Sequence, residues 1–142
     1  AAFLYAQLQE CNEITRKRKK IWDVYHESLF ELEKSKIVRR PNISLHCKHN
    51  AHMYYLLFKD ETQRNQFISN MKSLGVNTVF HYIPLHSSVA GQKYSKSIGS
   101  MKNTNFVSKS IVRLPFFIGL ENNINKVINS VYNSAEELKP WE

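Results

Sequence analysis

The feature that most limits the possible folds of this chain is one repeating stripe within residues 4–32. Its members are separated by alternating steps of four and three residues: Leu4, Leu8, Cys11, Thr15, Arg18, Trp22, Tyr25, Leu29 and Leu32. This spacing places side chains along one side of an α-helix. The sequence therefore predicts a long N-terminal helix, which must pack its apolar stripe on something.

The middle of this stripe is polar, because Thr15 and Arg18 interrupt it. A stripe that is apolar only at its two ends suggests that the helix packs on two bodies. The second end would pack on this domain and the first end on a body outside the sequence. The same spacing also fits a helix that packs on its own domain throughout. Because the sequence starts without methionine, inside the predicted helix, we expect it to be a piece of a longer protein.

Two predicted strands flank a second helix in the middle of the chain. The aromatic stretch 52–58 is short and bounded by polar residues, which is typical of a strand. Asp60 followed by Gln63 predicts a capped helix start, and Gly75 predicts the end of that helix. The apolar run 76–80 is the second predicted strand.

The last third of the chain continues this mixture of elements. Residues 91–105 are polar and without a repeat, so we expect a loop, followed by a short helix over 106–110. Residues 111–117 predict a strand, and apolar residues at helical spacing predict a final helix over 122–134. The predicted fold class is α+β, with helices covering a small antiparallel sheet in one domain of residues 1–142.

Size and charge set limits on the class of protein. With 142 residues, 42% of them hydrophobic, the chain can form one ordinary core. Two cysteines, Cys11 and Cys47, are too few for a disulfide framework, so we expect a reducing cytoplasm. The sequence contains no apolar run near the ~20 residues that a membrane span needs, and its start lacks the basic region of a signal peptide.

The formal net charge of +8 is compatible with an anionic partner. The densest basic run is Arg16–Lys20, which could contact a nucleic-acid backbone. However, five consecutive helical residues point in all directions around a helix, so we expect a solvated surface and no nucleic-acid partner. A stand-alone basic module for an anionic polymer such as nucleic acid stays open as an alternative function.

Histidines at positions 46, 49 and 52, with Cys47 among them, raise the possibility of a metal site. On an extended chain, side chains three residues apart point to opposite sides, so these histidines would not converge on one ion. The sequence also contains no G-x-S-x-G motif and, with four glycines, no glycine-rich phosphate loop. We therefore expect no metal and no self-contained catalytic set.

The stretch Phe80–His86, FHYIPLH, carries the strongest functional signal. Pro84 fixes one backbone torsion, so His81, Tyr82 and His86 would be presented with little freedom left to lose on binding. Imidazole and phenol groups can both donate hydrogen bonds to a sugar hydroxyl or a phosphate oxygen. The alternative is that both histidines are structural and that Tyr82 belongs to the core.

Four stretches of the sequence, in this order, resemble one family: AAFLYAQL (1–8), NAHMYYLLF (50–58), VFHYIPLHSS (79–88) and VRLPFF (112–117). They are similar to the C-terminal part of the pyridoxal-phosphate-dependent sugar aminotransferases of the DegT/DnrJ/EryC1/StrS family. The resemblance implies the small C-terminal domain of an aspartate-aminotransferase-like (fold type I) enzyme that works as a homodimer. The cofactor lysine would lie in a large N-terminal domain that this sequence lacks.

The resemblance also implies a reaction and a set of contact residues. The complete enzyme would transfer an amino group from a donor such as glutamate to a dTDP-4-keto-6-deoxy sugar, for cell-surface polysaccharide synthesis. The chain alone would be inactive and would hold no pyridoxal phosphate. The implied substrate contacts are His81, Tyr82 and His86, then Asn50, His52 and Tyr55, and finally Arg113. For Arg113, a structural ion pair is the alternative to a phosphate or carboxylate contact.

Overall fold

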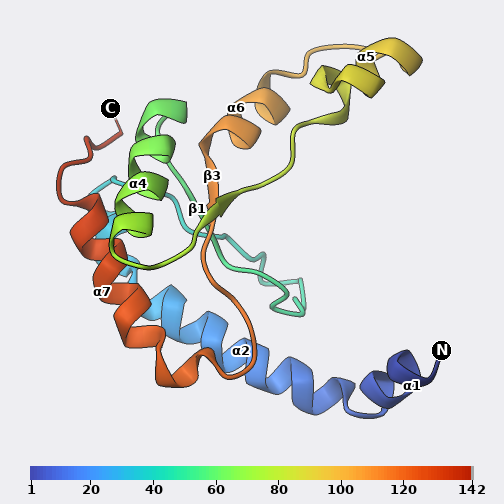
Figure 1. Cartoon of the computed structure of the whole chain (residues 1–142), viewed down its shortest axis with the longest axis vertical. Helices are drawn as coiled ribbons and strands as arrows, with labels where there is room; N and C mark the ends of the chain where they lie inside the picture. The colour runs from blue at the N-terminus through green and yellow to red at the C-terminus, as the bar shows by residue number, and fades with distance from the viewer. Residues whose placement is uncertain (142) are drawn as a thin grey trace.

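A computed structural model describes residues 1–141 of the chain and shows an α+β fold (Figure 1). The helices are α1 (Ala2–Gln9), α2 (Cys11–Ser28), α3 (Phe30–Lys34), α4 (Glu61–Ser73), α5 (Val89–Tyr94), α6 (Lys102–Ser110) and α7 (Ile124–Ala135). The strands are β1 (Tyr55–Leu57), β2 (Val79–Phe80) and β3 (Ile111–Arg113), and 3-10 turns lie at Leu85–Ser87 and Leu120–Asn122. The predicted fold class is confirmed.

The three strands form one antiparallel sheet in the order β1-β3-β2. The last strand in the sequence, β3, is therefore the central strand of the sheet. In its register, Val112 lies opposite Leu56 of β1 and Phe80 of β2. Arg113 lies opposite Tyr55 and Val79 in the same way. Because side chains alternate along a strand, these two rows point to opposite faces of the sheet.

The row that contains Val112 faces the helices. Leu56 and Val112 are fully buried, and α4 contacts both β3 and α7. In Figure 1, α4 and α7 lie together on one side of the sheet. The core between these elements is built from Phe58, Phe67, Met71, Val127 and Val131, among others. Burial of this apolar surface is the main term that stabilises the fold.

An aromatic cluster joins α2 to the segment that leads into β1. The Trp22 ring lies 4.5 Å from the rings of His26 and His49, and Tyr25 lies 5.2 Å from Tyr54. The Tyr25 hydroxyl donates to the Pro115 carbonyl oxygen at 2.9 Å. Burial raises the pKa of both tyrosines above the ordinary range, so both stay protonated. The cluster fixes the second half of the N-terminal helical region on the domain.

The N-terminal stripe behaves as the two-body interpretation predicts. Its second half is buried at Trp22, Tyr25, Leu29 and Leu32, whereas α1 has no buried residue. Figure 1 shows α1 extending away from the body of the domain. The alternative, a helix that packs on its own domain throughout, is wrong.

The prediction of one continuous helix needs a correction. The helical region is divided at Glu10 and Leu29, where ψ rises to 8° and 13°. The Leu29 amide still donates to the Tyr25 carbonyl at 3.0 Å, so the chain bends there without losing that hydrogen bond. The helices end at Lys34, before Pro41 is reached.

Two other expectations were wrong in extent. The strands are shorter than the apolar runs that predicted them, because pairing with β3 covers only 55–57 and 79–80. Residues 91–105 are a loop only over 95–101, since 91–94 belong to α5 and 102–105 to α6. The Ser88 side chain accepts from the Gly91 amide at 3.0 Å and caps α5. Helix α6 is held by contacts with α4 and β2 that a local repeat does not reveal.

The predicted start and end of α4 are largely correct. Asp60 accepts a hydrogen bond from the Gln63 amide at 2.9 Å, although the Gln63 side-chain oxygen has no partner within residues 1–141, so only half of the capping box forms. At the other end, Gly75 has φ of 73° and Val76 donates to the Met71 carbonyl at 2.9 Å. This is a Schellman ending, which favours glycine.

The cap at Asp60 leads to a test of the fold. We expect Asp60→Ala to lower the free energy of unfolding by about 1 kcal/mol, because an amide of the first turn loses its acceptor. Asp60→Asn keeps a side-chain oxygen at the same place and serves as the control. Urea denaturation followed by circular dichroism measures both variants. Equal stability of Asp60→Ala and the unaltered chain would contradict the cap.

The exposed side chains of α1 lead to a second test. Phe3 is 91% exposed, and Leu4, Tyr5 and Leu8 are also exposed, so we expect the chain to self-associate at high concentration. Leu4→Gln with Leu8→Gln should reduce this association while preserving helix propensity. Leu45→Gln removes an exposed leucine from a loop and should leave the association unchanged. Sedimentation equilibrium measures it, and a strict monomer for the unaltered chain would refute the prediction.

Candidate functional site

The sheet face that points away from α4 carries most of the predicted contact residues. Tyr55, Val79 and Arg113 share this face through the antiparallel register, and His81 follows Val79 at the next position on the same side. His52 lines a cavity of about 200 Å³ together with Val79 and Arg113. We call these five residues the open face.

Arg113 is the central cation of the open face. It is half-buried, and its guanidinium carbon lies 5.6 Å from the centre of the Tyr82 ring. Arg113 makes no ion pair within residues 1–141, and its Nε is buried without a hydrogen-bond partner there. The structural ion pair considered for this residue is therefore absent from the described part of the chain. A guanidinium with unused donors is suited to bind a phosphate or a carboxylate.

His81 lies beside this cation. Its ring is 4.8 Å from the Tyr82 ring, and its Nδ1 is buried without a partner among the described residues. Burial lowers the pKa of His81, and the positive charges of Arg113 and His52 lower it further. The imidazole is thus neutral at pH 7, with one donor and one acceptor nitrogen. Such a group can bind a sugar hydroxyl.

Tyr82 is not a core residue, because its side chain is 71% exposed. It lines a second cavity of about 560 Å³ with Leu85 and residues of α6 such as Val107. The interpretation of Tyr82 as part of the core is therefore wrong.

Tyr55 is half-buried on the open face, and burial raises its pKa.

His86 does not join the open face. Its Nε2 lies 2.8 Å from Oδ1 of Asn105 on α6, so Pro84 and the 3-10 turn direct it away from His81. Sequence reasoning missed Asn105, because the two residues are 19 positions apart and no local pattern connects them. The structure therefore separates the three predicted contacts of FHYIPLH into two locations.

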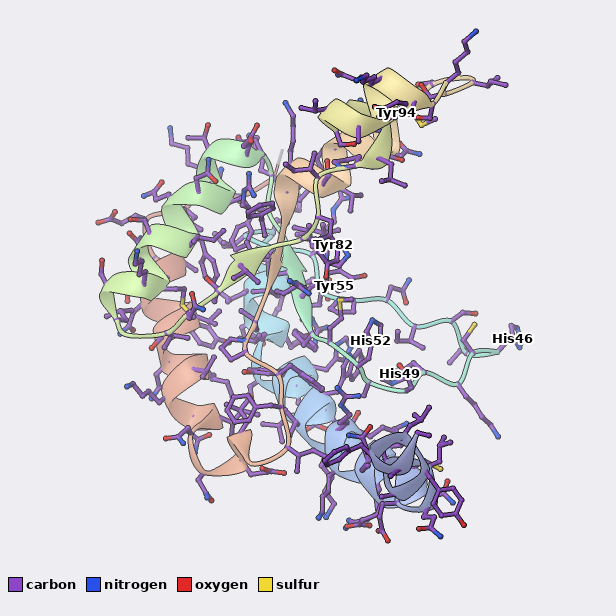
Figure 2. All side chains as sticks on the ribbon, turned by 45° about the vertical axis from the view of Figure 1, so that its right-hand side comes forward. His46, His49, His52, Tyr55, Tyr82 and Tyr94 are labelled. Atoms are coloured by element: carbon purple, nitrogen blue, oxygen red, sulfur yellow. The ribbon has the colours of Figure 1, made fainter. Side chains whose placement is uncertain are left out.

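The histidines of the loop before β1 also take separate positions. Oδ1 of Asn50 accepts a hydrogen bond from Nδ1 of His52 at 3.1 Å, and His52 belongs to the open face. His49 packs on Trp22, and His46 lies at the tip of the loop (Figure 2). Within residues 1–141, no three His, Cys, Asp or Glu side chains are grouped to hold a metal ion.

The basic run and the cysteines show no built site. Arg16 donates to Glu13 through Nε at 2.7 Å, and the Lys17 ammonium lies 3.6 Å from the same carboxylate. These side chains are exposed on α2. Cys11 and Cys47 are free thiols at exposed positions.

A pyridoxal phosphate would need a lysine for its covalent attachment. No lysine of the described chain lines the cavity beside Arg113 or the cavity beside Tyr82 and α6. The residues present on the open face therefore do not fit this cofactor, and we derive no chemical step through it. What they provide is a cation, a neutral imidazole and phenol groups, which can bind and orient a polar ligand.

Among residues 1–141, no helix is both long and apolar enough to cross a bilayer.

Comparison with known families gives one match over most of the chain. The sequence profile of the DegT/DnrJ/EryC1/StrS aminotransferase family matches residues 1–132. A protein of Methanocaldococcus jannaschii, the uncharacterized protein MJ1066, is 27% identical over 136 residues. That match covers 92% of this chain and 34% of the relative.

Comparison with solved structures shows the same fold. DesV of S. venezuelae, solved in complex with a ketimine intermediate, superposes with a TM-score of 0.81 at 21% identity. PseC of Helicobacter pylori, an aminotransferase involved in the biosynthesis of pseudoaminic acid, gives 0.80 at 17% identity. These matches cover 97% and 94% of this chain and 36% of each neighbour. The chain thus spans about a third of the length of these proteins and matches the C-terminal part of their fold.

The lowered pKa of His81 leads to a test of the open face. Between its folded pKa and the ordinary value of about 6.5, His81 binds fewer protons in the folded than in the unfolded chain. Stability therefore rises with pH in this window and is lost on acidification. We expect the free energy of unfolding to fall below about pH 6.5, and His81→Gln to remove part of that fall. His26, whose pKa burial also lowers, accounts for another part.

Nuclear magnetic resonance of the histidine rings checks the cause directly. Arg113→Gln should raise the pKa of His81, because it removes a nearby positive charge. Arg16→Gln removes the same charge from α2 and is the matched control. An unchanged His81 titration in Arg113→Gln would contradict the arrangement of the open face.

Proposed function

Because the chain belongs to the DegT/DnrJ/EryC1/StrS aminotransferase family, we propose that residues 1–142 are the small C-terminal domain of a sugar aminotransferase. The complete protein would include a large N-terminal domain, would use pyridoxal phosphate and would act as a homodimer in the cytoplasm. The match to the C-terminal part of the fold supports this proposal.

The proposed reaction transfers an amino group from a donor such as glutamate to a dTDP-4-keto-6-deoxy sugar. Among members of the family, we favour dTDP-4-amino-4,6-dideoxygalactose transaminase, on the HYIPLH and VRLPFF sequences. Its product serves bacterial surface polysaccharides such as lipopolysaccharide and enterobacterial common antigen. Pyridoxal phosphate, when bound, supplies the electron sink for amino transfer. We expect the chain alone to be inactive, because the lysine that binds this cofactor would lie in the large domain.

The observation that carries this proposal is the pair of unpartnered nitrogens on one face. Arg113 Nε and His81 Nδ1 are both buried without a hydrogen-bond partner in the described structure, and leaving such groups unpaired costs free energy. A sugar nucleotide brings the groups that satisfy them. Its diphosphate would bind to the Arg113 guanidinium, and a sugar hydroxyl would bind to the neutral His81.

The remaining predicted contacts take supporting roles in this proposal. Tyr82, which is largely exposed, would donate a hydrogen bond to the ligand through its hydroxyl. Tyr55 lies opposite Arg113 in the sheet, and His52 lines the cavity beside Arg113. Asn50 would orient His52 through their hydrogen bond of 3.1 Å. His86 would act from the α6 side, where Asn105 holds it. This division of contacts assigns recognition of the sugar nucleotide to this domain and the chemistry to the large domain.

The exposed apolar residues of α1 would contact the large domain. Phe3, Leu4, Tyr5 and Leu8 are all exposed, and the relatives extend far beyond the matched region. Burying these four side chains against the large domain would fix its orientation relative to the open face. The N-terminal helical region would then connect the two domains.

Single-turnover kinetics of the complete enzyme test this proposal. We expect His81→Ala, Tyr82→Phe, His86→Ala and Arg113→Gln to slow the half-reaction with the keto sugar nucleotide. A misplaced substrate loses on the order of ten- to a hundredfold in kcat/KM. The half-reaction with the amino-acid donor should change much less, because the donor makes none of the nucleotide contacts.

His46→Ala is the matched control, since this histidine lies at the loop tip, away from the open face. Cofactor loading, followed by its visible absorption, should remain intact in all variants. If all four variants kept the sugar kinetics of the unaltered enzyme, the open face would be structural. Recognition of the sugar nucleotide would then have to come from other residues.

A further inference from the structure

A third cavity lies between α4, α6 and the segment that follows β2. Its volume is about 430 Å³, and its charged members are Glu61, Arg64 and Lys109. It shares no lining residue with the cavity beside Arg113. The segment Tyr82–Pro84 lines both this cavity and the one beside α6, so it forms a wall between the two. We call the third cavity the α4–α6 cavity.

Arg64 is the most buried cation of this cavity. Its side chain is only 8% exposed, and its Nη2 donates to Glu61 at 3.1 Å. Its Nε is buried and has no partner within residues 1–141. Its guanidinium carbon lies 5.4 Å from the centre of the Phe80 ring. Burying a guanidinium costs free energy unless a negative charge balances it and its N–H groups have acceptors. Here Glu61 supplies the negative charge, but Nε has no acceptor within residues 1–141.

The charge of the cavity is unbalanced. Glu61 is the carboxylate that faces both cations, because its Oε2 also lies 3.5 Å from the Lys109 ammonium. Two positive groups therefore share one negative group, which leaves a net charge of +1. The side chains of Lys109 and Glu61 are 63% and 48% exposed, so both are accessible to solvent. Because both cations lie against the Glu61 carboxylate, an oxyanion that enters the cavity would compete with Glu61 for them.

The rest of the lining is suited to the body of a small molecule. Phe80, Tyr82, Ile83 and Pro84 contribute apolar surface, and the first three are exposed in the described structure. Among the polar members, Asn65 can donate a hydrogen bond. The Ser87 and Ser108 hydroxyls already donate to the carbonyl oxygens of Pro84 and Asn105 at 3.0 Å, so they can offer a ligand only an acceptor. A cavity that is mainly apolar with a few converging polar groups is the usual form of a small-ligand site.

From these contacts we propose that the α4–α6 cavity binds a small organic phosphate with a flat, apolar body. The phosphate lies between Arg64 and Lys109, and the body lies against Phe80 and Tyr82. A carboxylate can contact both cations, as Glu61 does, but a phosphate has one more terminal oxygen, which could accept from the unpartnered Nε of Arg64. The proposed sugar-nucleotide contacts include Tyr82, which borders both places, but neither Arg64 nor Lys109, so this cavity would be a second binding site of the domain.

Binding to the chain itself tests the proposal, with phenyl phosphate and inorganic phosphate as probes at pH 7.5. Isothermal titration calorimetry measures affinity, and chemical shifts of Phe80 and Tyr82 report the position of the ring. We expect saturable binding of phenyl phosphate, tighter than that of inorganic phosphate by about threefold or more, since the ring buries apolar surface. Raising the salt concentration should weaken both.

Variants of the charged residues give shifts of opposite sign. Lys109→Gln should weaken binding of phenyl phosphate by about two- to fivefold, as expected for one exposed charge contact. Glu61→Gln should tighten binding by a similar factor, about two- to fivefold, because its carboxylate competes with the phosphate for both cations. Lys102→Gln removes the same charge from α6 at a position outside the cavity and should leave the affinity unchanged.

Arg64→Gln should weaken binding about tenfold or more, because a buried charged hydrogen bond is lost. If that variant fails to fold, the Lys109 and Glu61 variants still decide the question. Each of the following results would overturn the proposal: no saturable binding of phenyl phosphate, weaker binding in Glu61→Gln, or equal loss in Lys109→Gln and Lys102→Gln. Shifts confined to Arg113 and His81 would place the phosphate on the open face and would overturn it as well.

Discussion

The structure depends on the pairing of β3 with two partners at once. This strand has three residues, and it joins β1 on one side and β2 on the other. Val112 must point into the core, where it is fully buried, so Arg113 must point to the opposite face. A shift of the register by one residue would place the arginine in the core and expose the valine. Core packing thereby fixes the position of the central cation of the candidate site.

The same pairing decides which residues surround that cation. Tyr55 and Val79 lie opposite Arg113 only because both outer strands are antiparallel to β3. His81 then emerges beside the guanidinium, where burial and the neighbouring charges lower its pKa. The open face leaves buried nitrogens of both residues without partners in the described chain. Unpaired polar groups of this kind are expensive to maintain, which is why we interpret them as a binding surface.

The packing of helix α4 against helix α6 forms a second polar site. Their contact places Glu61 between Arg64 and Lys109, residues far apart in the sequence. The segment after β2 closes this location on one side and borders the cavity beside α6 on the other. One short segment, which carries Tyr82 and Pro84, therefore contributes to two separate cavities. A ligand in either cavity would restrict the same backbone.

The sequence by itself determined the fold class, the two-part character of the N-terminal stripe, the start and end of α4, and the family resemblance. These features depend on local spacing, capping and composition, which a linear pattern records. The tertiary structure alone decided that Tyr82 is exposed, that Asn105 holds His86, and that residues 91–105 contribute to two helices. It also decided which histidines meet Arg113. These outcomes depend on contacts between distant segments, and local sequence patterns do not indicate the free energy of such contacts.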